Sequence, residues 1–188
     1  LDMARPDAFA PERAFTHVIV CAPVWLIGDA LIRRLAGQGM RRLIAFSSTS
    51  RLTKGESDEA AERDVVAALI AGEATVARAC DDMGVAWTIL RPTLIYDEGR
   101  DENVSRIARV IRKLGVFPLY GAATGLRQPV HARDLAAAAA AALRAEASYG
   151  KTYNLPGGET LAYRDMVKRI CAALRRPALL LPAPEGLW

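Results

Sequence analysis

Apolar residues in this chain gather in short runs that are separated by longer segments with helical spacing. Residues 17–22 (HVIVCA), 42–46 and 85–90 are compact apolar runs of the length of one strand each. Residues 25–39 and 58–83 place apolar side chains at intervals of three and four, which is typical of helices packed on one face. The order strand, helix, strand, helix, strand predicts a parallel sheet with right-handed crossovers.

The second half of the chain continues in shorter elements. The pattern predicts an arginine-rich amphipathic helix at 103–114, a brief strand at 128–130 and an alanine-rich helix at 134–145, capped by Asp134. A strand at 151–155, a helix at 163–174 and a strand-like end at 177–184 follow. We therefore expect an α/β fold with an incomplete doubly wound parallel sheet, Rossmann-like, and a small C-terminal α/β region on the substrate side.

The stretch 85–99, VAWTILRPTLIYDEG, is the centre of this pattern. Its strand must stop at Arg91-Pro92 or lie on an edge, because proline has no N–H to donate to a sheet. Ligands of parallel α/β sheets bind beyond the carboxyl ends of the strands. Arg91, Pro92 and Thr93 therefore occupy a position where ligand contacts are made.

The long helix at 58–83 is predicted to pack on the sheet through Val65, Leu69, Val76 and Cys80. Glu73 lies within the same helix among apolar neighbours. A buried carboxyl group needs a partner, and burial raises its pKa. We interpret Glu73 as a structural residue.

Composition excludes several classes of function. The chain has 188 residues, 52% of them hydrophobic, and a net charge of +4, with arginines scattered along helices and few aromatic residues between them. This pattern favours solvated helix faces over a nucleic-acid surface. The three cysteines and two histidines are far apart, so we expect no metal site and no disulfide framework, and a cytoplasmic location. The acidic group after the central strand, residues 97–102, indicates a solvated loop. We expect no membrane span.

Five motifs, taken in order, resemble a known family: FSSTS after a strand, a long helix, TILRPTLIY, RQPVHARDLA and TYNLPGGETLAYRDMV. Together they look like the NAD(P)-binding epimerase/dehydratase branch of the short-chain dehydrogenases, and more narrowly like its atypical members. The resemblance covers residues 15–182. It implies NAD or NADP as cofactor and a small-molecule substrate such as a nucleotide sugar.

The resemblance also implies roles for individual residues. Thr49 or Ser48 would be the substrate-orienting hydroxyl, and Arg127 would bind a substrate diphosphate, because a guanidinium fork suits phosphate. The cofactor would contact Cys21, Ala22, Pro23, Ser47, Arg91, Pro92 and Thr93. The structural alternatives stay open: hydroxyl residues also cap strand ends, and a lone arginine is often a surface residue. His131 is interpreted as structural.

Two departures from the family matter. The glycine-rich phosphate loop is missing, since the first strand is followed by Cys21-Ala22-Pro23, so we expect the first βαβ unit to lie outside this chain and cofactor binding to be weak. Active members carry Tyr-x-x-x-Lys on the long helix, and aligning on Glu73 puts Val65 and Leu69 at those two positions. Neither side chain can carry a proton or a charge.

Two hypotheses follow. The chain is an oxidoreductase or epimerase/dehydratase-like protein that works without the usual tyrosine, or it is a non-catalytic dinucleotide-binding or scaffolding protein of the same fold. Residues 1–128 would form the partial NAD(P)-binding domain, and residues 129–188 would complete the sheet and the substrate side. An oligomer is compatible with either hypothesis.

Overall fold

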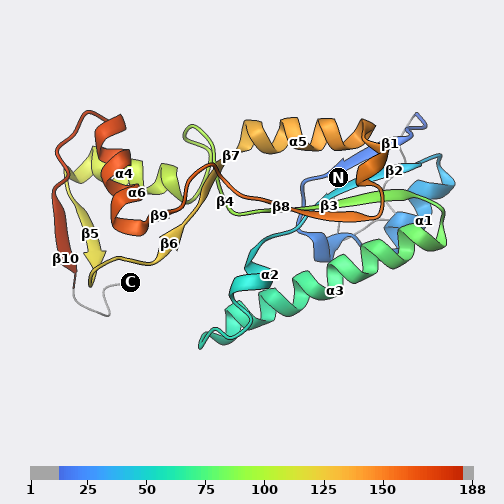
Figure 1. Ribbon diagram of the computed structural model, residues 1–188, viewed down its shortest axis with the longest axis horizontal. Helices are drawn as coiled ribbons and strands as arrows, with labels where there is room; N and C mark the ends of the chain where they lie inside the picture. The colour runs from blue at the N-terminus through green and yellow to red at the C-terminus, as the bar shows by residue number, and fades with distance from the viewer. Residues whose placement is uncertain (1–12, 184–188) are drawn as a thin grey trace. The chain divides into compact units, whose positions relative to one another are not determined.

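The computed structural model describes residues 13–183, which form two compact units (Figure 1). Unit 1 runs to Pro92 and resumes with Ala136–Leu155. Unit 2 comprises Thr93–Leu135 and the chain after Leu155. Unit 1 is therefore discontinuous in sequence, because the first part of unit 2 is inserted into it. The expected division of roles at residue 128 stays a prediction.

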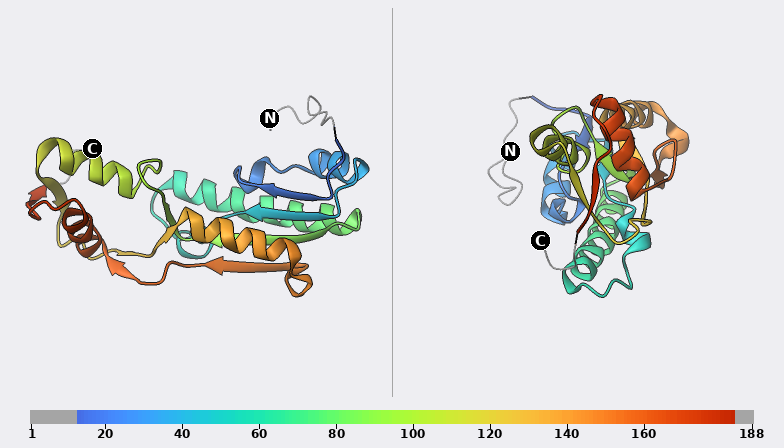
Figure 2. Two further views of the ribbon diagram at one scale, coloured as in Figure 1. Left: turned by 90° about the horizontal axis from the view of Figure 1, so that it is seen from above. Right: turned by 90° about the vertical axis from the view of Figure 1, so that its left-hand side faces the viewer.

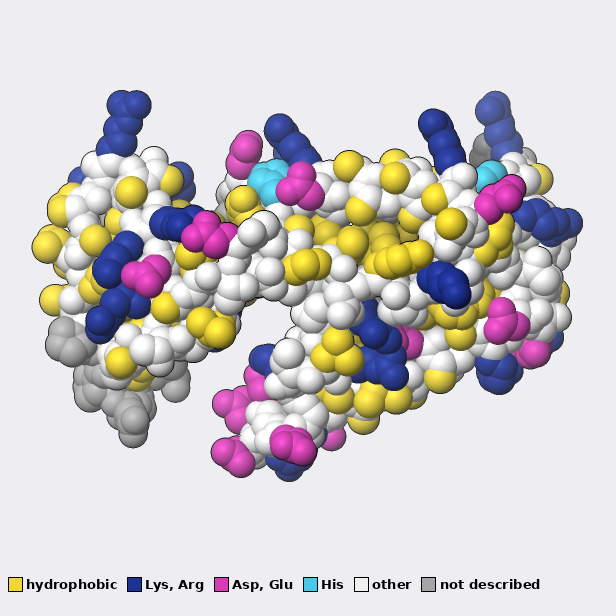
Figure 3. All heavy atoms as spheres, viewed as in Figure 1, with side chains coloured by type: hydrophobic (Ala, Val, Ile, Leu, Met, Phe, Trp, Pro, Cys, Tyr) yellow, Lys and Arg dark blue, Asp and Glu magenta, His cyan; other side chains and the backbone are white. Residues whose placement is uncertain are grey.

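A four-stranded parallel sheet forms the centre of unit 1. Its strands are β1 (His17–Val20), β2 (Arg42–Phe46), β3 (Ala86–Pro92) and β8 (Lys151–Leu155), in the order β1-β2-β3-β8. All three pairings are parallel, and Figure 2 shows the strands side by side. The predicted α/β class with a parallel, Rossmann-like sheet is confirmed. In the space-filling view a band of hydrophobic side chains lies between α5 (Ala132–Arg144) and α3 (Ala60–Asp82), on the side of the edge strand β8 (Figure 3).

Helices cover both faces of this sheet (Figure 1). The alternation of side chains along β2 directs Leu43 and Ala45 to the core shared with α1 (Asp29–Gly37) and α3 (Ala60–Asp82). Ile44 points to the other face, where it packs with Ala139 and Ala142 of α5 (Ala132–Arg144). Three short helical segments complete the unit: η2 (Val24–Leu26), α2 (Ser50–Thr53) and η3 (Glu146–Ser148).

The first helix begins later than its apolar spacing predicted. Residues 24–26 form a 3-10 turn that buries Val24 and leaves Trp25 43% exposed. Ile27 is buried next to this turn, and Gly28, in extended conformation, precedes α1. The apolar positions 24, 27 and 31 are thus buried without one continuous helix.

The core face of α3 also differs from the prediction by one position. Val65 is 44% exposed, whereas Val66 is 6% exposed and packs inward together with Leu69 and Val76. The buried positions 66, 69, 73, 76 and 80 follow the helical spacing of three and four, and residue 65 does not belong to that series. Gly72 lies on the same helix, and a Cβ atom there would stand 2.8 Å from the Trp25 backbone nitrogen. The absence of a side chain at Gly72 lets α3 approach η2 closely.

Within the described residues, unit 2 consists of three two-stranded pairs, two whole helices and the first turn of α5. β4 (Leu94–Tyr96) pairs with β7 (Pro129–His131), β5 (Phe117–Tyr120) with β10 (Leu180–Ala183), and β6 (Leu126–Arg127) with β9 (Leu161–Ala162). The helices α4 (Val104–Leu114) and α6 (Tyr163–Ala173) lie within about a residue of the predicted bounds. Their facing side chains form a core of its own with β5, which includes Ile107, Ile111, Phe117, Leu119, Val167 and Ile170.

The predicted cap of the alanine-rich helix is wrong. α5 begins at Ala132, so Asp134 lies in its first turn and does not precede it. The His131 Nδ1 atom instead accepts the backbone N–H of Arg133 at 3.0 Å. His131 also packs edge-to-face against Tyr96, with ring centroids 5.0 Å apart. Its structural interpretation fits both contacts.

No helix within residues 13–183 has the length and apolar composition that crossing a membrane requires.

Candidate functional site

The serine-threonine turn after β2 is hydrogen-bonded to the carboxyl end of β3. The Ser47 backbone N–H donates to the Leu90 carbonyl oxygen at 2.8 Å. Thr49 donates twice to the Pro92 carbonyl oxygen, from its N–H at 3.1 Å and from Oγ1 at 3.2 Å. The structure thus brings two predicted elements of the site, the hydroxyl turn and the arginine-proline strand end, to one edge of the sheet.

Glu73 joins these two elements from the helix α3. Its side chain is only 4% exposed. Oε1 accepts hydrogen bonds from Ser47 Oγ at 2.5 Å and from Arg91 Nε at 2.9 Å, and Oε2 accepts one from Arg91 Nη2 at 2.5 Å. Arg51 Nη1 also contacts Oε2. One buried carboxylate therefore holds groups from the turn after β2, from α2 and from β3 in fixed positions.

These partners lower the pKa of Glu73, whereas burial alone was expected to raise it. Burial on its own raises the pKa of the carboxyl group, as predicted, but the hydrogen bonds and positive charges of Arg91, Ser47 and Arg51 outweigh burial and lower it. The pKa of Arg91 is raised mainly by its hydrogen bond to Glu73. The cluster is therefore ionised at neutral pH.

Each candidate hydroxyl already has a hydrogen-bond partner within the protein. Ser47 Oγ donates to Glu73 and Thr49 Oγ1 donates to the Pro92 carbonyl oxygen. Ser48 Oγ donates to Ser50 Oγ and accepts the Ser50 backbone N–H, each at 3.1 Å. A catalytic role for Thr49 or Ser48 stays a prediction, and it requires the hydroxyl to exchange its present partner for a substrate.

The remaining predicted cofactor contacts lie in two places. Cys21 and Pro23 are exposed and Ala22 is half-buried at the carboxyl end of β1, which is paired to β2 in the same sheet. Thr93 belongs to unit 2, where its hydroxyl donates to the Gln128 carbonyl oxygen. The grouping of Cys21, Ala22, Pro23 and Thr93 as cofactor contacts stays a prediction.

The positions that the resemblance assigns to tyrosine and lysine have contrasting surroundings. Val65 is exposed on α3, and Leu69 is 2% exposed within the apolar core that α3 forms with α1 and the sheet. Neither position offers a group that could transfer a proton.

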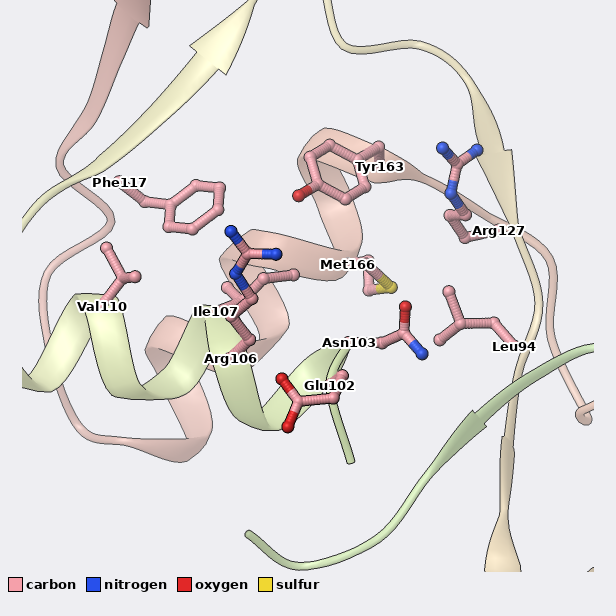
Figure 4. Close-up of a pocket in the computed structure, with 10 residues that line it drawn as sticks. All are labelled: Leu94, Glu102, Asn103, Arg106, Ile107, Val110, Phe117, Arg127, Tyr163 and Met166. Carbon is pink, nitrogen blue, oxygen red and sulfur yellow. The ribbon is translucent and has the colours of Figure 1, made fainter. Parts of the chain in front are cut away.

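Unit 2 contains a cavity of about 340 Å³ that sequence reasoning identified only through Arg127. Figure 4 shows Arg106 rising from α4 toward the hydroxyl of Tyr163, with Arg127 on the far side of the Tyr163 ring. The Arg127 guanidinium carbon lies 5.5 Å from the centre of that ring, and Nη1 donates to the Leu126 carbonyl oxygen at 2.8 Å. A neighbouring cavity of about 360 Å³ shares Phe117, Arg127 and Tyr163.

Electrostatics distinguish this cavity from the rest of the chain. Burial raises the pKa of Tyr163, while the charges of Arg127 and Arg106 oppose that rise. Unit 2 has 12 Lys and Arg residues against 8 Asp and Glu, whereas unit 1 has 13 of each, so the net charge of +4 lies in unit 2. Basic side chains are spread over the visible face of unit 2 (Figure 3). The sequence pattern did not identify three of the residues that line this cavity, Arg106, Phe117 and Tyr163. Periodicity shows which residues are polar or apolar but not which of them line a cavity.

Metal binding has no support in residues 13–183, where no group of three or more His, Cys, Asp or Glu residues is placed to hold an ion. The acidic loop before α4 is organised by hydrogen bonds instead. Asp101 accepts the backbone N–H groups of Asn103 at 2.8 Å and of Ser105 at 3.1 Å. These bonds, together with one from the Ser105 hydroxyl, lower the pKa of the Asp101 carboxyl group against the effect of burial.

Residues 26–155 match the model of the NAD dependent epimerase/dehydratase family. A relative in Arabidopsis thaliana, named NADH dehydrogenase [ubiquinone] 1 alpha subcomplex subunit 9, mitochondrial, is 33% identical over 125 residues, which are 66% of this chain and 27% of that protein.

Solved structures share the fold. A UDP-glucose 4-epimerase of Thermus thermophilus, in complex with NAD, is similar with a TM-score of 0.71 at 23% identity, over 90% of this chain and 65% of that one. MoeE5 in complex with UDP-glucose and NAD gives a TM-score of 0.76 at 16% identity, over 97% and 69%. The chain thus spans about a quarter of the plant subunit and about two thirds of these structures. By its family match over most of its length, the chain belongs to the NAD dependent epimerase/dehydratase family.

Proposed function

We propose that this protein binds a nucleotide sugar, or a similar phosphorylated polar compound, in the cavity of unit 2. The observation that carries the proposal is the placement of two guanidinium groups, Arg106 and Arg127, on either side of Tyr163. The two arginines come from different elements, α4 and β6, and line the same cavity (Figure 4). Arg127 is the residue that the sequence motif assigned to a substrate diphosphate.

The chemistry of the cavity suits a nucleotide. An arginine offers a planar fork of N–H groups that matches the oxygens of a phosphate, and two arginines match a diphosphate. The rings of Phe117 and Tyr163 supply flat apolar surfaces against which a base or a sugar can pack. The excess positive charge of unit 2 favours the approach of an anionic ligand.

NAD or NADP is the proposed cofactor. Its support is membership of the family and the position of the predicted contacts at the carboxyl edge of the unit 1 sheet, where such sheets bind nucleotides. The Thermus epimerase and MoeE5 were both solved with NAD. The proposed contacts are Cys21, Ala22, Pro23, Ser47, Arg91, Pro92 and Thr93. Weak binding is expected because the glycine-rich loop is missing from residues 1–188.

A second candidate is a non-catalytic protein of the same fold, and three observations favour it. The positions assigned to the tyrosine and the lysine hold Val65 and Leu69. The Ser48 and Thr49 hydroxyls already donate to Ser50 Oγ and to the Pro92 carbonyl oxygen. The Arabidopsis relative carries the name of a subunit of NADH dehydrogenase. If turnover occurs, Thr49 or Ser48 orients the substrate and the proton carrier is a group other than tyrosine. The cytoplasmic location and oligomeric state remain predictions.

Titration with UDP-glucose tests the proposed function. We expect Arg127→Gln and Arg106→Gln each to weaken binding by about tenfold, since each removes one charge-assisted hydrogen bond to phosphate. Arg109→Gln is the matched control, because Arg109 is exposed on the same helix and does not line the cavity. Equal affinity of all four proteins, or no binding by the unaltered chain, would refute the proposal.

Turnover separates the two candidates. NADH and NADPH fluorescence titrations report cofactor binding, and a panel of nucleotide sugars with NAD reports oxidation or epimerisation. Product formation that Thr49→Ala abolishes supports an enzyme. Binding of both ligands with no product supports the non-catalytic candidate.

A further inference from the structure

The Glu73 cluster, which consists of Glu73, Ser47, Arg51 and Arg91, contains two positive charges and one negative charge. Arg91 forms a two-point ion pair with Glu73 through Nε and Nη2, which by itself neutralises the buried charge. Ser47 adds a third hydrogen bond to the same carboxylate. Arg51 then brings a second cation to Oε2. One carboxylate and two guanidinium groups leave the cluster with one net positive charge.

Arg51 retains donors for another partner. Its contact with Glu73 is made through Nη1, so Nε and Nη2 carry three further N–H groups. The Arg51 side chain is 29% exposed, compared with 15% for Arg91 and 4% for Glu73. Solvent exposure therefore increases across the cluster, from the buried Glu73 through Arg91 to Arg51, which solvent reaches.

The position of Arg51 in the fold favours a ligand. Arg51 lies in α2, directly after the turn that follows β2, and Leu52 donates its N–H to the Thr49 carbonyl oxygen. This is the carboxyl edge of the parallel sheet, where ligands bind in such folds. Lys54, which directly follows α2, pairs with Glu62 in the first turn of α3. The Arg63 guanidinium donates to the Ser57 carbonyl oxygen.

We propose that Arg51, positioned by Glu73 and supported by the charge of Arg91, forms a subsite for a phosphate group of a bound ligand. A phosphate would accept hydrogen bonds from the outer edge of the Arg51 guanidinium and balance the excess charge. Arg51 is the ligand-binding residue, and Glu73 is a positioning residue that acts through it. The subsite lies wholly in unit 1 and is independent of the cavity that contains Arg127.

Binding stoichiometry tests the subsite separately from the proposed function. Isothermal titration with inorganic pyrophosphate is expected to show two sites on the unaltered chain. Arg127→Gln should remove the unit 2 site, Arg51→Gln should remove the unit 1 site by weakening it at least about tenfold, and the double variant should bind at neither. If Arg51→Gln keeps both sites, the inference fails while the proposed function stands. If Arg51→Gln removes one site but Arg127→Gln keeps both sites, the proposed function fails and the inference stands.

Two matched variants sharpen the assignment. Lys54→Gln removes a cation that directly follows the same short helix and should leave both sites intact. Arg51→Lys keeps the charge without the fork, so its affinity should fall between those of the unaltered chain and Arg51→Gln. Malonate should compete poorly at the unit 1 site, and competition as strong as that of pyrophosphate would overturn the assignment to phosphate.

A measurement on the unaltered protein tests the subsite without relying on the folding of any variant. Pyrophosphate should shift the backbone amide resonances of Ser47 to Arg51 in a ¹⁵N-labelled sample. Amides of α1, such as that of Arg34, should not shift. Absence of shifts in the turn would overturn the subsite whatever the variants do.

Discussion

Among single residues, Glu73 has the largest influence on the candidate site because its carboxylate has three partners from three segments of the chain. Ser47, Arg51 and Arg91 are fixed by one acid that is almost inaccessible to solvent. Loss of one member of a buried ion pair leaves the other charged and unpaired, which is costly in free energy. The positions of the side chains at the carboxyl edge of the sheet therefore depend on Glu73, which is almost fully buried.

The lowered pKa of Glu73 predicts a pH dependence of stability. Its pKa is lower in the folded chain than in the unfolded chain, so ionised Glu73 stabilises the fold at neutral pH and this contribution is lost as pH falls through the folded pKa. We expect Glu73→Gln to lower the free energy of unfolding by about 2–3 kcal/mol at neutral pH. The difference from the unaltered chain should shrink in acid, as measured by urea unfolding with the fluorescence of Trp25 and Trp87 in unit 1.

The control for this prediction is Glu159→Gln. Glu159 pairs with Arg169 on the surface of unit 2, and both side chains are more than half exposed. Exposed pairs contribute little to stability, so this variant should behave like the unaltered chain at every pH. A constant difference for Glu73→Gln across the pH range would contradict the linkage.

At the scale of elements, the contact between α3 and η2 depends on one glycine. A Cβ atom at Gly72 would meet the backbone of Trp25 at 2.8–2.9 Å, and a backbone cannot move aside as a side chain can. We expect Gly72→Ala to destabilise the fold by about 1–3 kcal/mol, even though alanine is the better helix former. Thermal unfolding followed by circular dichroism measures the effect.

Gly37→Ala provides the comparison. Gly37 is also helical, in α1, but a Cβ atom there meets nothing within 4 Å. This variant should be neutral or stabilising by up to about 1 kcal/mol. Equal melting temperatures of the two variants would show that α3 and η2 do not pack as closely as described.

Elements with strong periodicity were predictable from the sequence, and those that depend on distant contacts were not. The strand at 42–46 is a mostly apolar run with clear ends, and the strand at 151–155 lies between a glycine and a Pro-Gly-Gly turn. The structure confirms the bounds of both. The start of α1 was missed because residues 24–26 form a 3-10 turn, which leaves Leu26, an apolar position of the predicted helix, 40% exposed. Val65 was assigned to the buried face of α3, which contains its neighbour Val66 instead.

The candidate site was predictable only as a location. The arginine-proline strand end and the hydroxyl turn meet at one edge, as expected from the parallel order of the strands. The partners of Glu73 come from positions 18, 22 and 26 residues away, a relation that no local pattern encodes. For the same reason the direction of its pKa shift was predicted from burial alone and came out reversed.

On the scale of the whole molecule, unit 1 is completed by residues that follow the insertion. α5 supplies Ala139 and Ala142 to the second face of the sheet, and β8 pairs with β3. A chain that ends at residue 128 lacks both. We expect it to show no cooperative thermal transition, because Ile44 and Leu90 would face solvent.

A chain that ends at residue 155 is the matched comparison, since it retains every strand of the unit 1 sheet. It should unfold cooperatively, as judged by circular dichroism and by the dispersion of its amide resonances. Cooperative unfolding of the shorter chain would show that α5 and β8 are dispensable for unit 1.

The interruption of unit 1 also has a consequence during synthesis. The ribosome releases β1, β2 and β3 well before α5 and β8. One face of the nascent sheet therefore stays exposed to solvent while the inserted segment is translated. Closing this long loop is a slow step compared with forming the local helices. The growing chain therefore exposes the aliphatic side chains of Ile44 and Leu90 until Ala142 and Leu155 have emerged.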